Sequence, residues 1–104
     1  MKVNVTLVTA PDRKVARKIA DALVLERLAA CVSVVPGVAS TYRWKGKTRH
    51  DREVLLVIKS RASLAVRLRK RIVELHPYEV PEILHLPVAG GAASYLKWVG
   101  EVTT

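Results

Sequence analysis

The sequence contains one cysteine, Cys31, and no long apolar segment. A single cysteine cannot form an internal disulfide, which fits a reducing compartment. The longest uncharged apolar run, around residues 28–35, is far shorter than the ~20 residues that a membrane-spanning helix needs. The first residues alternate in polarity and lack the apolar stretch and cleavage site of a signal peptide. We therefore expect a cytoplasmic protein that crosses no membrane.

Aromatic and acidic residues are also scarce. The chain has no Phe, two Trp and three Tyr, and nine Asp and Glu stand against eighteen Lys and Arg, a formal charge of +9. This excess raises nucleic acid or an acidic surface as a partner, although the basic residues are spread over three segments and also suit solvated faces. An RNA-binding module of this size needs exposed aromatics on its central strands, and residues 53–58 contain none. We therefore expect no specific nucleic-acid partner.

Half of the residues are apolar, and their spacing defines the expected elements. Alternation and β-branched composition predict strands at residues 2–9, 30–44, 47–59 and 82–86. Helical spacing predicts a helix from about 11 to 26 or 28, a second from a Ser60 or Ser63 cap to 75, and a third at 92–99. The order is that of a ferredoxin-like βαββαβ fold of the α+β class with an extra C-terminal helix. Without linkers or repeats, residues 1–104 are expected to form a single domain.

The second and third predicted strands are unusually long. Pro36-Gly37 predicts a bulge in the first of them, and Lys45-Gly46-Lys47 predicts the tip of a hairpin between the two. The run Val54–Ile58 is apolar throughout and is expected to be buried on both faces. A hairpin that outruns its sheet leaves unpaired edges, so we expect another copy of the chain to cover it.

Two histidines lie in the proline-bracketed stretch "HPYEVPEILHLP", residues 76–87. His76 ends the second predicted helix, where its imidazole can either bind a metal or complement the negative end of the helix dipole. His85 alternates with leucines and is expected to pack or to lie at the surface. Cys31 is expected to be a small buried apolar residue rather than a ligand.

No pattern in the sequence supports catalysis. An acylphosphatase-like enzyme shares the predicted fold but needs a glycine-rich anion cradle after its first strand, and Thr9-Ala10-Pro11-Asp12 is not one. No Ser or Cys nucleophile has a histidine base near it in the sequence. We therefore expect a non-enzymatic protein without an organic cofactor.

Four blocks in this order and spacing resemble the divalent-cation tolerance (CutA) family: "ERLAACVSVVPGVASTYRWKGK", "EVLLVIKSR", "HPYEVPEILHLPV" and "YLKWV". The resemblance covers essentially the whole chain. It implies a small protein that is cytoplasmic where bacterial, and a tight homotrimer in which the long hairpin joins sheets between subunits. It also implies a link to copper and other divalent cations.

The resemblance suggests one metal ligand and a ligand cleft. Some members are ascribed copper at a Cys before the Thr-Ala-Pro turn and at two successive His before Pro-Tyr; these positions are Val8, Leu75 and His76 here, so only His76 carries over. One imidazole makes no selective site, which predicts weak or context-dependent binding of Cu²⁺ or another divalent cation.

A second interpretation concerns a polar and aromatic set that would wall a cleft between subunits. Its members are Tyr42, Trp44, Lys59, Tyr78, Glu79, Glu82 and Trp98. In this hypothesis Lys59 recognises a small anion, and the protein is a small-molecule or anion-sensing module. A simpler alternative is an intrachain ion pair between Lys59 and Glu82.

Overall fold

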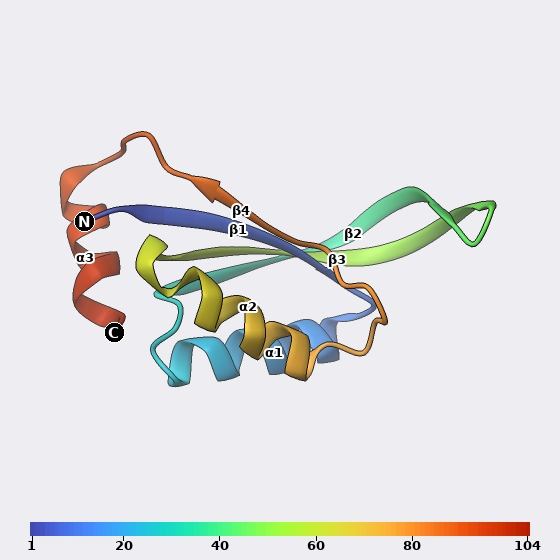
Figure 1. Ribbon diagram of the computed structural model, residues 1–104, viewed down its shortest axis with the longest axis horizontal. Helices are drawn as coiled ribbons and strands as arrows, with labels where there is room; N and C mark the ends of the chain where they lie inside the picture. The colour runs from blue at the N-terminus through green and yellow to red at the C-terminus, as the bar shows by residue number, and fades with distance from the viewer.

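The computed structural model describes residues 1–104 as a four-stranded antiparallel sheet with helices on one face (Figure 1). The strands are β1 (Val3–Ala10), β2 (Cys31–Trp44), β3 (Lys47–Arg61) and β4 (Ile83–Pro87), in the spatial order β2-β3-β1-β4. The helices are α1 (Arg13–Leu25), α2 (Ala65–Leu75) and α3 (Ala93–Val102), with a short 3₁₀ turn η1 (Ala62–Leu64) before α2. The predicted α+β, ferredoxin-like order with a C-terminal helix is confirmed.

α1 begins after its predicted start and ends before its predicted end. Asp12 is its N-cap, and its carboxylate accepts a hydrogen bond of 2.9 Å from the Val15 N–H, so Pro11 precedes the helix rather than occupying its first turn. The helix stops at Leu25, before the predicted limit at 26 or 28, because Arg27 adopts a left-handed φ of 62° that no helix continues through.

α2 is entered without a serine cap. No side chain caps η1 or α2, and the Ser60 hydroxyl is buried without a hydrogen-bond partner, so the predicted Ser60 or Ser63 cap is wrong. The 3₁₀ turn replaces it by leading the chain from β3 directly into the helix.

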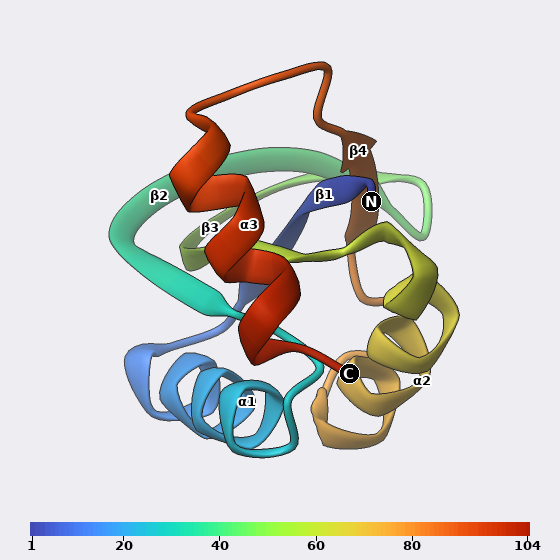
Figure 2. The same ribbon diagram turned by 90° about the vertical axis from the view of Figure 1, so that its left-hand side faces the viewer.

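The main core lies between the sheet and the α1–α2 layer. Its largest fully buried side chains are Val8, Ile19, Leu23, Leu56, Ile58, Leu68 and Ile72. A second, smaller cluster around Val3, Ala30 and Val99 holds α3 against one end of the sheet, as Figure 2 shows.

β3 alternates between a buried and a half-buried face. Leu56 and Ile58 are buried beneath the helices, whereas Leu55 and Val57 on the other face are only partly covered. The prediction that residues 54–58 are buried on both faces is therefore wrong for one chain, because α1 and α2 cover only one side of the sheet (Figure 1).

The predicted long hairpin is confirmed and extends beyond the rest of the molecule (Figure 1). β1 pairs with β3 only as far as Val54, so the hairpin from Val38 to Glu53 has no third strand. The β2–β3 register shifts between Val35 and Val38, which places the predicted bulge at Pro36-Gly37. At the tip, Lys45 and Gly46 both have positive φ, as a two-residue turn of type I′ requires.

None of the three helices combines the length and the apolar character required to cross a membrane.

Candidate functional site

Two tyrosines meet two carboxylates where the hairpin leaves the sheet. The Tyr78 hydroxyl, from the loop after α2, donates a hydrogen bond of 2.8 Å to Glu53 on β3. The Tyr42 hydroxyl on β2 donates a hydrogen bond to Asp51, which lies two residues from Glu53 on the same strand. The two carboxylates therefore share one face of β3, and each is bound by a phenol.

The pKa of each of the two phenols is raised above its ordinary value. The pKa of Tyr78 is raised first by burial and then by its hydrogen bond to Glu53 and the charges of Glu53 and Asp51. The pKa of Tyr42 is raised mainly by its hydrogen bond to Asp51. At neutral pH these phenols act as hydrogen-bond donors, not as bases.

His76 lies beside this cluster and is fixed by two hydrogen bonds. Its Nε2 is 2.7 Å from the Thr9 carbonyl oxygen, and its Nδ1 accepts from the Tyr78 N–H at 3.2 Å. A neutral ring protonated at Nε2 satisfies both contacts. The imidazole is buried, and its ring centroid is 4.7 Å from that of Tyr78.

A metal bound to His76 would have to replace one of these two contacts. The chain also brings together no group of three His, Cys, Asp or Glu side chains that could hold an ion. The donor set of one chain therefore does not fit a copper site, which needs several nitrogen or sulfur ligands in fixed geometry. Metal binding by His76 stays a prediction that depends on ligands from other chains.

Lys59 lies on the sheet face opposite α1 and α2. Its ammonium donates hydrogen bonds to the Ser33 hydroxyl at 2.8 Å and to the Val57 carbonyl oxygen at 3.1 Å, and it has no carboxylate partner. The Cys31 sulfur is 4.0 Å from the same hydroxyl. Cys31 is only partly buried, which corrects the expectation of a buried apolar residue.

The alternative ion pair between Lys59 and Glu82 is wrong. Lys59 pairs across the sheet with Val5, whose neighbour on β4 is Leu86, while Glu82 precedes the other end of β4. The antiparallel register thus separates the two charges along the strand direction.

The seven predicted cleft residues do not come together within one chain. Tyr42 and Tyr78 belong to the cluster at the hairpin base, and Trp44 lies at the tip with Lys45 5.7 Å from its ring centroid. Lys59 and the α3 residue Trp98 lie toward the other end, where Trp98 packs against Tyr95. The exposed Glu79 and Glu82 have no hydrogen-bond or ion-pair partner. The cleft predicted between subunits therefore remains a prediction, because one chain does not assemble it.

Sequence reasoning missed Asp51 and Glu53, the carboxylates that accept hydrogen bonds from the two tyrosines. It also missed Ser33, the hydrogen-bond partner of Lys59. Glu53 is buried, yet it stands at the start of an apolar run, a position where a charged residue signals a specific partner. Ser33 gave no comparable signal, because a single serine within a strand of mixed polarity is ordinary. A hollow of about 410 Å³ adjoins the cluster between the β1–α1 turn and the bulge at Gly37.

Comparisons with known proteins agree with the observed fold and with the family resemblance of the sequence. The family model described as "CutA1 divalent ion tolerance protein" matches residues 4–102. The chain is 52% identical over 100 residues to the divalent-cation tolerance protein CutA of Thermus thermophilus, covering 96% of this chain and 97% of that protein. A solved structure of the divalent cation tolerance protein from Thermus thermophilus superposes with a TM-score of 0.96 at 50% identity, over 98% of this chain and 99% of that one.

A plant relative is longer. The protein named "Protein CutA, chloroplastic" from Arabidopsis thaliana is 46% identical over 99 residues, which cover 95% of this chain but 54% of that protein. The chain therefore spans nearly all of the bacterial relative and about half of the plant relative.

Proposed function

Because the chain belongs to the CutA1 divalent ion tolerance family, we propose that it is a non-enzymatic homotrimer that binds copper or other divalent cations weakly and through its assembled form. The names of its relatives supply the link to divalent cations. The observation on which the proposal rests is the uncovered face of the sheet, together with a hairpin that has no third strand.

The uncovered face is apolar across several strands. Val5, Leu7, Leu55 and Val57 on β1 and β3 alternate with core residues and point away from the helices. Leu84 and Leu86 on β4 continue this face with 53% and 46% exposure. A contiguous apolar surface of this kind marks a protein interface, and closed symmetry allows further copies to cover it.

The assembled protein also supplies the additional cation ligands that one chain lacks. The only imidazole suggested as a ligand by the family resemblance, His76, has both ring nitrogens engaged within its own chain. A site that uses residues from several chains would have few ligands per chain and modest affinity, since softer cations need several donors.

Calorimetric titration of Cu²⁺ at neutral pH tests the cation proposal. If His76 is a ligand, His76→Gln weakens copper binding at least fivefold, while His50→Gln on the exposed hairpin leaves it unchanged. Acidification also releases the ion from the parent protein, because only the neutral imidazole coordinates. Equal affinity in the parent and in His76→Gln would reduce His76 to a structural residue at the end of α2.

The second candidate function is recognition of a small anion by Lys59. This ammonium is bound only by a hydroxyl and a carbonyl oxygen, so its charge is not neutralised within the chain. An oxyanion between subunits would supply the missing negative charge. Sulfate should therefore raise the melting temperature of the parent and of Lys97→Gln but not that of Lys59→Gln; equal shifts in all three proteins would exclude a specific site.

The cytoplasmic location stays a prediction, because the name of the Arabidopsis thaliana relative assigns that protein to another compartment.

A further inference from the structure

The outer surface of the α1–α2 layer contains most of the net positive charge of the chain. The two helices include eight basic and two acidic residues, a net +6 of the total +9. Their apolar residues Ala16, Ile19, Leu23, Leu68 and Ile72 are buried against the sheet. The basic side chains therefore point outward, and the two helices lie side by side below the sheet (Figure 2).

Most of these basic side chains have no partner of opposite charge. Arg71 is held by Glu26 at 2.9 Å and by Glu74 at 3.5 Å, and Arg17 lies 3.7 Å from Asp21. The other six, Arg13, Lys14, Lys18, Arg67, Arg69 and Lys70, are exposed and make no hydrogen bond or ion pair. Their charge is therefore available to an external anion.

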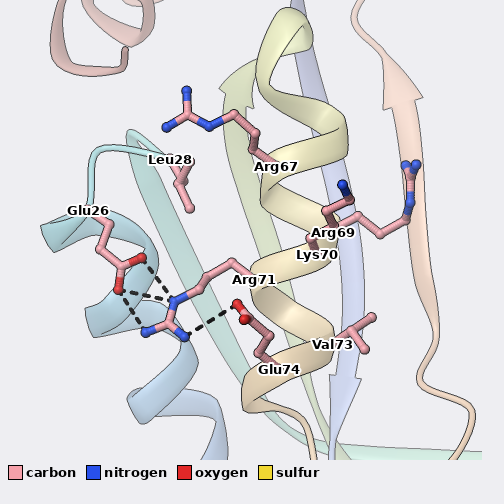
Figure 3. A pocket seen from close by; sticks show the side chains of 8 residues that line it. All are labelled: Glu26, Leu28, Arg67, Arg69, Lys70, Arg71, Val73 and Glu74. Carbon is pink, nitrogen blue, oxygen red and sulfur yellow. Dashed lines mark hydrogen bonds and ion pairs between the residues drawn. The ribbon is translucent and has the colours of Figure 1, made fainter.

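The densest part of this surface is a hollow of about 700 Å³ between the end of α1 and α2 (Figure 3). Arg71 is fixed in it by a bidentate contact with Glu26, and Figure 3 shows Arg67 extending on the same side of α2. Lys70 and Arg69 also line the hollow, but Figure 3 shows the Arg69 guanidinium extending from the opposite side of α2 toward β4. Because Glu26 and Glu74 already neutralise the Arg71 guanidinium, the groups that can contact phosphates are the unpaired cations along the helix. Cations spaced in this way suit several phosphate groups more than one compact anion.

We propose that the α1–α2 layer docks the sugar–phosphate backbone of nucleic acid, independently of base sequence. Neither helix contains an aromatic residue, so the surface has nothing on which bases can stack. Cations without base contacts give affinity and orientation but no sequence readout. This surface lies on the side of the sheet opposite the apolar face proposed for assembly, so both can be used at once (Figure 1).

An anionic membrane fits this surface less well than a phosphate backbone does. Helices that bind in a lipid interface turn a continuous apolar face toward the acyl chains. Here those faces are buried against the sheet, and the exposed apolar side chains of the layer are limited to Val24, Leu25, Val66 and Val73.

Fluorescence anisotropy with a labelled duplex of about 20 base pairs, from about 50 to about 200 mM salt, tests the proposal on the full-length protein. The test variant combines Arg67→Gln, Arg69→Gln and Lys70→Gln. The control removes the same charge elsewhere through Lys2→Gln, Lys47→Gln and Lys97→Gln, all at exposed positions. Circular dichroism confirms that both variants are folded.

The test variant should bind the duplex at least tenfold more weakly at low salt, and its salt slope should fall by about 0.9 for each lost phosphate contact. The control variant should lose less than threefold, and a duplex of unrelated sequence should bind the parent equally well. Equal losses in the two variants, or no binding by the parent at about 50 mM salt, would overturn the proposal. Binding to phosphatidylserine vesicles but not to duplex would overturn it in favour of a membrane.

Discussion

The Tyr78 hydroxyl donates a hydrogen bond of 2.8 Å to the buried carboxylate of Glu53. This bond joins the proline-bracketed loop after α2 to the point where β3 leaves the sheet. The neighbouring imidazole of His76 contacts both the Thr9 carbonyl oxygen and the Tyr78 N–H. The loop is therefore tied to β1 and to the hairpin by side chains rather than by strand pairing.

Removing the Tyr78 hydroxyl should destabilise the protein more than removing that of Tyr42. In Tyr78→Phe the buried Glu53 carboxylate loses its partner, and a hydrogen bond to a charged group is worth about 1.5–3 kcal/mol. Tyr42→Phe removes an exposed contact to Asp51, whose carboxylate water can solvate, so it should cost clearly less. Urea unfolding of both variants measures the difference; equal costs would show that Glu53 does not depend on Tyr78.

Unfolding free energy should depend on pH through His85. Its Nδ1 contacts the Thr6 hydroxyl at 2.8 Å and its Nε2 is buried without a partner. Burial and then the charge of Arg69 lower the pKa of this imidazole in the folded protein. The imidazole pKa in the unfolded chain is ~6.5. As the pH falls below this value, the unfolded chain binds a proton that the folded chain does not. The free energy of unfolding therefore decreases until the pH reaches the lower pKa of the folded protein.

Urea unfolding between pH 7 and pH 5 checks this prediction for His85. His85→Gln should flatten the decline in stability, since glutamine does not titrate but can still contact Thr6. His50→Gln on the hairpin is the matched control and should retain the decline. If the stability of His85→Gln declined with falling pH as steeply as that of the parent, the pH dependence would come from other groups.

The bulge in β2 should make Gly37 sensitive to substitution. Gly37 has a φ of +75°, and no heavy atom lies within 4 Å of where a Cβ would be. Gly37→Ala therefore costs only backbone strain, about 1–2 kcal/mol. Gly90→Ala, at an equally open position without a positive φ, should be neutral or slightly stabilising. Thermal unfolding compares the two; similar melting temperatures would show that the bulge adapts to a side chain.

Periodicity was enough to predict the order of elements, because the apolar spacing of β1, α1, β3 and α2 reflects one shared core. It failed at the entry to α2, where Ser60 satisfies the local pattern of a cap but its buried hydroxyl makes no hydrogen bond to the helix. It also overstated the burial of β3 within one chain, since an apolar run looks the same whether helices cover both of its faces or only one.

The contacts in the candidate site could be predicted from the sequence less completely than the fold. Tyr42 and Tyr78 were predicted to wall a cleft between subunits, which stays a prediction. Their partners within the chain, Asp51 and Glu53, depend on the hairpin register and the path of the loop after α2. Lys59 and Glu82 were paired because one ends a predicted strand and the other begins the strand after the proline-bracketed loop, but the strand register places them apart. Contacts between distant segments follow from topology and register, which composition does not encode.

Assembly is the central claim, and light scattering on the purified protein at micromolar concentration tests it most directly. We expect a particle of three 11.5 kDa chains. Leu86→Glu places a charge on the uncovered sheet face and should shift the particle toward single chains, whereas Val66→Glu on α2 should leave three. A parent protein that remains a stable single chain at that concentration would contradict the trimer, the intersubunit cleft and the shared cation site together.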